Sequence, residues 1–293
     1  MNKNLTKITI AGVPEHFNLP WHLAIGKNKF HKKGIDLIWK DYHGGTGAMC
    51  EALKNKEADI ALVLTEGAFK ELIKNPHSKI VKIYVDSPLI WGIHTGKKSK
   101  IKEQKDLEKA TVAISRFGSG SHLMAKVNAH NNGWNPENLQ YKTIKNIEGG
   151  IQEINNNPNS YFLWEHFTTK PYVENGNAKE IGKIKTPWPC FVMMVRKDVL
   201  KNHKKEIKKI IKIINKEVKR LEKDKKSDKI IQLFSNKYQQ KLQDIKEWLS
   251  VTKWNTKKGI SKKKFHQIQD KLLQFKVIEN SFKYNKVIEK VFK

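Results

Sequence analysis

The sequence predicts an α/β fold, because short apolar runs suited to buried strands alternate with glycine-rich turns and helical patterns. Thr111–Ile114 is such a run with β-branched members, and Arg116–Ser121 follows it as a turn with two glycines. Apolar side chains return at helical spacing from Leu123. A small-residue loop between a strand and a helix start places free backbone N–H groups where an anion is favoured. Arg116 adds a two-pronged contact suited to a carboxylate, phosphate or sulfonate.

The same order occurs earlier in the chain, which strengthens the α/β prediction. A strand is predicted over residues 35–39, the loop H-G-G-T-G over 43–47 and a helix over 48–53. A buried strand follows at Ile60–Leu64, and Thr65–Gly67 is predicted as a further loop. The pattern therefore predicts a mostly parallel sheet with helical connections.

The first segment fits this pattern, with a strand at Ile8–Gly12 and a loop from Val13 to Trp21. Loops at the carboxyl ends of parallel strands gather on one side of an open sheet, where ligands bind. Neither the dinucleotide glycine pattern nor the P-loop lysine pattern is present. These loops therefore predict one shared small-molecule site.

Five segments carry a resemblance to a known family. They are G-V-P-E-H-F-N-L-P-W-H-L-A, G-G-T-G-A-M-C-E-A-L with the following E-A-D-I-A, R-F-G-S-G-S-H-L-M-A, Y-F-L-W-E-H-F-T-T-K-P, and F-V-M-M-V-R-K-D-V-L-K-N-H. In their residues and order, these segments resemble type 2 periplasmic-binding-protein-like domains, in the branch related to alkanesulfonate-binding proteins and thiamine-pyrimidine synthases. The resemblance covers residues 5–215. It implies two α/β lobes, each a mixed sheet flanked by helices, that close on a small molecule.

The crossing points of that architecture give the domain prediction. Residues 1–90 and 191–293 form lobe 1, and residues 91–190 form lobe 2, with Pro187-Trp188-Pro189 marking the return. Helices that complete lobe 1 are predicted near 203–222, 227–250, 261–275 and 281–292.

The candidate ligand-binding residues lie in the predicted loops and at strand ends. Polar side chains there suit hydrogen bonds, and the flat rings of tryptophans suit a planar ligand. Glu165 and His166 are adjacent on a predicted strand and point to opposite faces, so no acid–base pair is expected from them. The predicted set is Glu15, His16, Asn18, Trp21, Gly45, Thr46, Glu66, Trp91, Arg116, Gly118, Ser119, Ser121, His122, Trp164 and Glu165.

No metal site, cofactor or disulfide is predicted. The eleven histidines include no H-E-x-x-H motif and no Cys/His cluster. The two cysteines, Cys50 and Cys190, fall within predicted elements and are expected to be buried free thiols. The sequence also lacks the iron-binding cysteine cluster of the fungal pyrimidine synthases.

The formal net charge of +28 is typical of nucleic-acid-binding proteins, but other features of the sequence argue against specific nucleic-acid binding. Only three of the 57 basic residues are arginines, although Arg is the residue suited to bidentate phosphate contacts. Residues 197–293 hold 29 basic and 11 acidic residues, arranged around an apolar stripe typical of an amphipathic helix. We expect these lysines to form a solvated face with weak, salt-sensitive attraction to polyanions and no specific nucleic-acid recognition.

Two functions remain open from the sequence. The first is a small-molecule binding protein without catalytic activity, similar to ABC-transporter substrate-binding proteins, with transporter components as potential partners. The second is a cytoplasmic enzyme of the thiamine-pyrimidine or menaquinone-pathway type, because the same scaffold hosts both. No apolar run is long enough to span a bilayer, so no membrane insertion is expected. No signal peptide is visible before the first strand, which favours a cytoplasmic protein, or a periplasmic one if a leader has been removed.

Overall fold

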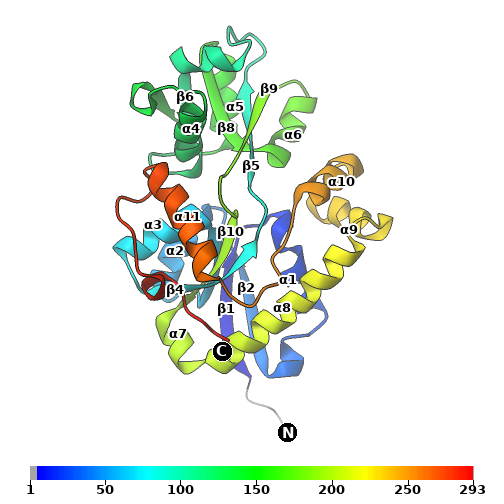
Figure 1. Cartoon of the computed structure of the whole chain (residues 1–293). Coiled ribbons are helices and arrows are strands. Elements are labelled where there is room, and N and C mark those ends of the chain that lie inside the picture. The colour runs from blue at the N-terminus through cyan, green and yellow to red at the C-terminus, as the bar shows by residue number, and fades with distance from the viewer. Residues whose placement is uncertain (1–4, 293) are drawn as a thin grey trace. The chain divides into compact units, whose positions relative to one another are not determined.

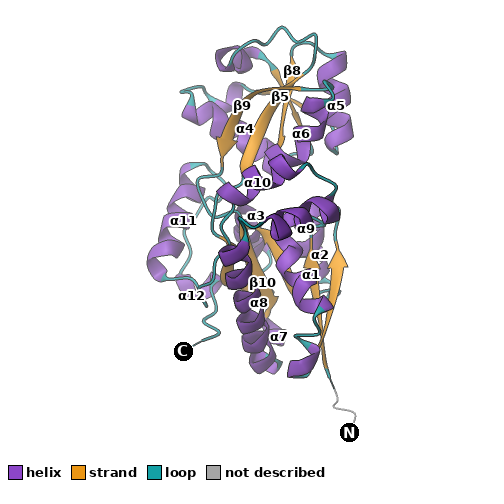
Figure 2. Ribbon diagram, turned by 90° about the vertical axis from the view of Figure 1, so that its right-hand side faces the viewer, coloured by secondary structure: helices purple, strands orange, loops and turns teal. Residues whose placement is uncertain are grey.

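The computed structural model describes residues 5–292 and divides the chain into two compact units. Unit 1 comprises Met1–Ser87 and Trp188–Lys293, and unit 2 comprises Pro88–Pro187 (Figure 1). Each unit contains one mixed five-stranded sheet, and helices flank the strands of each (Figure 2). The predicted two-lobed α/β fold class is confirmed.

The sheet of unit 1 has the strand order β2-β1-β3-β10-β4. β1 runs parallel to β2 and β3, whereas β10 runs antiparallel to both β3 and β4. β3 is almost wholly apolar because it lies at the centre of the sheet, where both faces are covered. The strands are β1 Thr6–Gly12, β2 Ile35–Asp41, β3 Ile60–Leu64, β4 Ser78–Val85 and β10 Phe191–Arg196.

Nine α-helices complete unit 1 over its described residues. They are α1 Leu19–Gly26, α2 Gly45–Lys54, α3 Thr65–Lys74, α7 Lys197–Asn202, α8 Lys204–Asp224, α9 Asp228–Tyr238, α10 Leu242–Val251, α11 Lys262–Gln274 and α12 Tyr284–Val287. Two 3₁₀ helices, η1 His16–Asn18 and η2 His31–Lys33, lie in the first loops. The C-terminal segment covers the β4 edge of the sheet, where the Glu289 N–H donates to the Ile80 carbonyl at 3.0 Å.

Three predicted boundaries in unit 1 are wrong. The helix predicted over 227–250 is two helices, because Gln239 adopts a left-handed conformation with φ 53° that ends α9. In place of the helix predicted over 281–292, the structure has a helix only at Tyr284–Val287. Ile288 directly after it forms a parallel β-bridge with Ile80 of β4. The predicted loop Thr65–Gly67 is the first turn of α3, which follows β3 without an intervening turn.

The sheet of unit 2 has the order β7-β6-β8-β5-β9. β6 is parallel to β7 and β8, and β5 is antiparallel to β8 and β9, so the topology repeats that of unit 1. The strands are β5 Ile90–Thr95, β6 Thr111–Ile114, β7 Gln140–Thr143, β8 Ser160–Glu165 and β9 Lys179–Lys185. The helices are α4 Gly120–Asn131, α5 Ile147–Asn156 and α6 His166–Glu174, with 3₁₀ helices η3 Gln104–Lys109 and η4 Pro136–Asn138.

None of the helices within residues 5–292 combines the length and the apolar character needed to cross a bilayer.

Candidate functional site

The first loop of unit 1 leaves the carboxyl end of β1 and is fixed by hydrogen bonds to its backbone. The Phe17 carbonyl accepts from the Tyr84 hydroxyl at 2.6 Å and from the Trp254 indole N–H at 2.9 Å. The Asn18 amide donates to the Val13 carbonyl at 2.7 Å, so this predicted ligand residue also closes the loop. All of these bonds are buried, which holds the loop in one conformation.

The His16 side chain in this loop has unused hydrogen-bonding capacity. It is buried, and its ring packs 4.7 Å from Tyr238 and 5.0 Å from Trp248. Burial lowers the pKa of His16 to about 4, although a hydrogen bond with Gln240 acts in the opposite direction, so the imidazole is neutral near pH 7. Its Nε2 atom has no hydrogen-bond partner within the described part of the chain.

Two other residues predicted in this loop occupy different environments. Glu15 is half-buried and immediately precedes η1. Trp21 is fully buried, and its ring packs on those of Phe30, Trp39 and Tyr84. Trp21 is therefore part of the core of unit 1 and presents no ring surface to a ligand in this structure.

The loops after β2 and β3 are shorter than predicted, and their polar side chains join elements of the fold. α2 begins at Gly45, and the Thr46 hydroxyl in its first turn accepts from the Leu64 N–H at 3.0 Å. A Cβ on Gly67 would lie 2.4 Å from the Thr46 methyl carbon, so α3 approaches α2 closely there. Thr46 thus connects the start of α2 to the end of β3.

Glu66 is buried in the first turn of α3 and does not stand at an open edge. One of its carboxylate oxygens accepts from the Trp188 indole N–H at 2.8 Å. Burial raises the pKa of Glu66, although hydrogen bonds from its backbone and from Trp188 oppose the shift. The pair joins α3 to the segment that re-enters unit 1 before β10.

The loop after β6 in unit 2 has the predicted form of a strand, a small-residue turn and a helix start. Gly118 adopts φ 78°, a left-handed conformation that favours glycine. Its N–H donates to His122 Nδ1 at 3.0 Å, and Ser119 caps α4 by accepting from the His122 N–H at 3.3 Å. The Ser121 hydroxyl accepts from the Ser115 N–H at 3.0 Å and lies 3.0 Å from the Ser119 hydroxyl. The turn is therefore ordered by its own serines, and the first turn of α4 adds its amide donors.

This same loop exposes one charged and one large apolar side chain. The Arg116 side chain is exposed and forms no ion pair or hydrogen bond with another residue in the range 5–292, while its carbonyl accepts from the Ser119 N–H at 3.2 Å. Phe117 is 65% exposed and packs edge-on to His122, with ring centroids 5.3 Å apart. Tyr141 lies against both rings, at 4.8 Å from His122 and 5.8 Å from Phe117. The loop thus presents a guanidinium beside an aromatic group.

The remaining predicted residues lie where β5 and β8 pair. Trp91 is buried opposite Glu165 in the antiparallel ladder, and half-buried Trp164 packs on the apolar cluster that contains Phe162. One Glu165 carboxylate oxygen accepts from the Thr168 N–H and hydroxyl, each at 2.8 Å, so Glu165 caps α6. Burial raises the pKa of Glu165, and the Thr168 hydrogen bonds oppose it.

A His–Glu–His cluster in unit 2 was missed by the sequence reasoning. His166 Nδ1 lies 2.5 Å from Glu180 Oε2, and His94 Nε2 lies 3.8 Å from the same oxygen. Burial lowers the pKa of His94 to about 4, whereas the hydrogen bond and charge of His166 lower the pKa of Glu180 despite its partial burial. His166 was predicted on the same strand as Glu165, but β8 ends at Glu165 and His166 begins α6, where its ring contacts Glu180 of β9. His94 and Glu180 are partners on adjacent strands but lie 86 residues apart in the sequence, so no local pattern indicates their contact.

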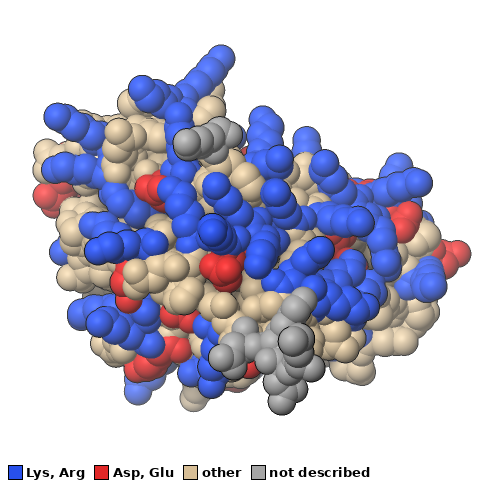
Figure 3. Space-filling model, turned by 90° about the horizontal axis from the view of Figure 1, so that it is seen from below, with Lys and Arg blue, Asp and Glu red and all other residues tan. Residues whose placement is uncertain are grey.

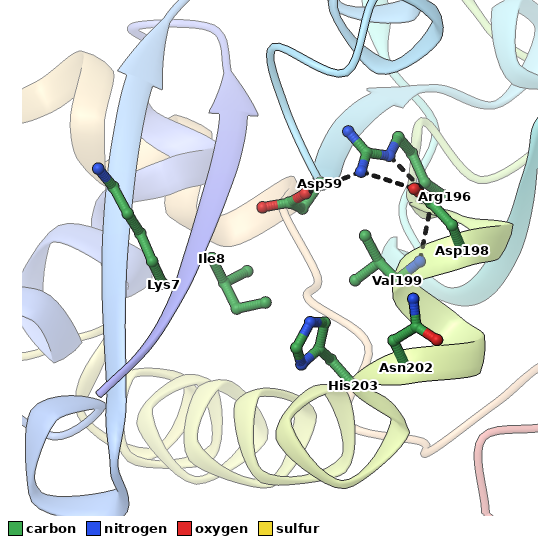
Figure 4. Close-up of a pocket in the computed structure, with 8 residues that line it drawn as sticks. All are labelled: Lys7, Ile8, Asp59, Arg196, Asp198, Val199, Asn202 and His203. Atoms are coloured by element: carbon green, nitrogen blue, oxygen red, sulfur yellow. Dashed lines mark hydrogen bonds and ion pairs between the residues drawn. The ribbon is translucent and has the colours of Figure 1, made fainter. Parts of the chain in front are cut away.

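A small cavity of about 140 Å³ lies at the opposite edge of the unit 1 sheet, at the amino end of β1 (Figure 4). The Arg196 guanidinium makes a bidentate contact with the Asp198 carboxylate, from Nε to Oδ1 at 3.0 Å and from Nη2 to Oδ2 at 2.9 Å. Its Nη2 also lies 3.4 Å from Asp59 Oδ1. Asp59 also accepts from the Thr9 N–H at 2.8 Å. Two carboxylates, Asp59 and Asp198, match the two cations that line the cavity, Lys7 and Arg196, so this junction of β1, β3, β10 and α7 offers no excess positive charge to an anion.

Within residues 5–292, no group of three or more His, Cys, Asp or Glu side chains is arranged to hold a metal ion. The two cysteines, Cys50 and Cys190, are free and buried, as predicted.

These strand orders, with an antiparallel strand inserted in each parallel sheet, define a class: the chain has the periplasmic-binding-protein fold. The predicted resemblance to periplasmic-binding-protein-like domains, including alkanesulfonate-binding proteins, is confirmed. More particularly, residues 91–184 match the model of the Ca3427-like periplasmic-binding-protein family.

Solved structures match almost the whole chain. One is the conserved Candida albicans CA3427 gene product, described as defining a new family of proteins with the generic periplasmic-binding-protein fold. It is 27% identical to this chain with a TM-score of 0.86, and the match covers 98% of this chain and 97% of that one. The alkanesulfonate-binding protein SsuA from Xanthomonas axonopodis pv. citri, bound to MOPS, is 11% identical with a TM-score of 0.78, covering 97% and 98%. The ligand-binding component of an ABC-type import system from Staphylococcus aureus, with zinc bound, is 14% identical with a TM-score of 0.74, covering 97% of each chain. No curated protein matches the sequence.

Proposed function

We propose that the chain is a small-molecule binding protein that takes an anionic ligand with a planar or apolar part. The observation that carries the proposal is the loop after β6, which combines exposed Arg116 with the Ser119-capped start of α4. A helix N-terminus and a guanidinium both favour negative charge. In this proposal the loop at the carboxyl edge of the unit 2 sheet contacts the ligand.

The chemistry beside Arg116 narrows the ligand class. Phe117 exposes a ring that belongs to the edge-packed group with His122 and Tyr141. Exposed large rings in a loop are suited to contact an apolar or heteroaromatic body. An organic sulfonate, carboxylate or phosphate with such a body fits both features, and one structural relative is an alkanesulfonate-binding protein.

Two of the three acidic side chains of the predicted set, Glu66 and Glu165, favour binding over catalysis. Glu66 is hydrogen-bonded to Trp188, and Glu165 caps α6 through Thr168. A general base needs a carboxylate within reach of a substrate proton, whereas these two carboxylates stabilise the fold. If the chain acts like the Staphylococcus aureus relative, its partners would be the transporter components of an import system.

Native mass spectrometry of the purified protein, followed by calorimetry with the ligand class found, tests this proposal. We expect a co-purified organic anion, or saturable binding of a member of a panel of aromatic and aliphatic sulfonates, carboxylates and phosphates. Turnover of the bound compound into a product would contradict the binding function and support the enzymatic alternative.

Replacing Arg116 by Ala should weaken binding of that ligand by about 2–4 kcal/mol, the range for truncating one partner of a buried charge contact. Arg220→Ala is the matched control, because it removes another exposed arginine, in unit 1. Equal affinities of the two variants by calorimetry would show that Arg116 is a surface residue without a role in binding.

A further inference from the structure

Helix α8 has two faces of opposite character. Its apolar side chains are buried in unit 1, and they are Ile207, Ile210, Ile211, Ile214, Val218 and Leu221. Asn215 on the same helix accepts a hydrogen bond from Lys82 of β4, which fixes the helix on the sheet. The rotation of α8 about its axis is therefore set by packing, and the opposite face is held towards solvent.

That outer face carries an unbroken lysine stripe, which we define as Lys205, Lys209, Lys212, Lys216, Lys219 and Lys223. All six side chains are exposed. At 3.6 residues per turn they occupy an arc of about 80° and extend over about 27 Å of helix. Within residues 5–292, Lys209 is the only one of these six side chains with a hydrogen bond or ion pair, to the Lys33 carbonyl at 3.1 Å and to Glu206 at 3.8 Å.

The acidic residues of α8 lie off the lysine stripe. Glu217 is buried and pairs with Lys27 and Lys29, while Glu222 pairs with Lys225 at 3.0 Å and accepts from the Trp254 N–H. Glu217 and Glu222 are therefore engaged within unit 1 away from the stripe, whereas Glu206 lies 3.8 Å from the stripe residue Lys209. Figure 3, seen from the end of unit 1 where α7 and the start of α8 lie in Figure 1, shows many Lys and Arg side chains spread across that face and fewer acidic ones.

We propose that the lysine stripe is a sequence-independent binding surface for the phosphate backbone of nucleic acid. A straight row of cations complements the regular row of phosphates along a strand, and its attraction comes from counterion release. Lysines act as point charges without the planar fork that reads base edges, so the surface attracts phosphates without selecting a sequence.

The observations favour nucleic acid over an anionic membrane. Surface helices that bind lipid combine basic residues with an apolar face directed into the bilayer. The apolar face of α8 is instead buried in unit 1. The exposed large apolar side chains of residues 5–292 lie on other elements: Ile73, Phe117, Leu233, Leu242 and Val251.

The salt dependence of duplex binding tests the proposal. With six lysines engaged, the affinity of the full chain for a 20-base-pair duplex should fall about 10³-fold between 50 and 200 mM salt. AT-rich and GC-rich duplexes should bind equally, because no base edge is read.

A stripe variant with Lys212, Lys216, Lys219 and Lys223 changed to Gln should bind more weakly at 50 mM salt. Its affinity should then fall only about tenfold over the same salt range, because two stripe lysines remain. The matched control changes Lys97, Lys98, Lys100 and Lys102 of unit 2 to Gln. These lysines are also exposed, and replacing them lowers the net charge by the same four units. The control should keep the 10³-fold dependence, and circular dichroism checks that both variants are folded.

Two results would overturn the proposal. Equal weakening in the two variants would assign the attraction to net charge spread over the molecule. Stripe-dependent binding to vesicles of phosphatidylserine and phosphatidylcholine, without stripe-dependent binding to duplex, would assign the surface to lipid.

Discussion

The two units share one strand order but differ in what their carboxyl-edge loops do. In unit 1, Phe17, Thr46 and Glu66 are all engaged by hydrogen bonds from other elements. In unit 2, the loop after β6 exposes Arg116 and Phe117. One topology therefore supports both a fixed edge and an exposed edge, and strand order alone does not place a ligand contact.

The difference originates in the C-terminal residues, which belong to unit 1 only. They supply Trp254, whose indole N–H reaches the Phe17 carbonyl, and Tyr238 and Trp248, which cover His16. Unit 2 has no corresponding segment in its continuous stretch of chain. Unit 1 is therefore supported at its edge by a second layer of side chains.

The largest expected effect comes from removing that support. Trp254→Ala should destabilise the protein by about 3–5 kcal/mol, because it removes a buried ring and one donor to Phe17. Trp254→Phe should cost much less, because Tyr84 continues to donate to the same carbonyl. Urea unfolding measures the free energy of unfolding of both variants. Leu242→Ala is the control, because it truncates an exposed side chain. A loss below 1 kcal/mol for Trp254→Ala would show that the first loop is held without the C-terminal layer.

A smaller effect is expected in unit 2, where Gly92 leaves room for the His–Glu–His cluster. A Cβ there would lie 2.4 Å from His94 Cε1 and 2.6 Å from Glu180 Oε2. Gly92→Ala should therefore destabilise by about 1–3 kcal/mol through overpacking. Gly26→Ala is the control, since a Cβ at Gly26 meets nothing within 4 Å. Matching melting temperatures for the two variants would mean that the cluster can move aside.

A third effect is a pH dependence that belongs to unit 1. Lys82 is fully buried on β4 and donates to the Asn215 side chain and the Asn255 carbonyl, and burial lowers its pKa to about 7. The unfolded chain keeps this proton up to about pH 10.4. Between these values the unfolded state holds more protons, so the free energy of unfolding rises with pH, by at most about 1.4 kcal/mol per pH unit.

Urea unfolding of the wild type and Lys82→Met at pH 6, 7, 8 and 9 measures this contribution. The difference between the two curves should change above pH 7 and stay constant below it. A constant difference across the whole range would show that Lys82 keeps its proton in the folded protein.

Local pattern was sufficient for the elements that depend on local sequence. The strand predicted over Thr111–Ile114 has those bounds in the structure, because its apolar run ends at a turn whose Ser119 caps the next helix. The predicted buried stripe of α8 also agrees with the structure, since its 3.6-residue period is a direct property of the sequence.

Contacts across the chain explain what the sequence did not reveal. Thr46 and Glu66 were predicted for a ligand because they follow strands, and the structure adds that the Thr46 hydroxyl accepts from Leu64 and one Glu66 oxygen accepts from Trp188. The role of Trp254 in the first loop depends on a contact between residues 237 positions apart. No periodicity or motif encodes such a pairing, because it arises only when the sheet has assembled.

The place of β10 between β3 and β4 has a consequence for how the protein is made. When a ribosome has released residues up to 187, all five strands of unit 2 are present, but the sheet of unit 1 lacks one of its inner strands. Unit 2 can therefore fold during synthesis, whereas the first 87 residues must wait for β10 and for Trp254. The part of unit 1 that ends at Ser87 is thus the part of the nascent chain that most needs protection from aggregation.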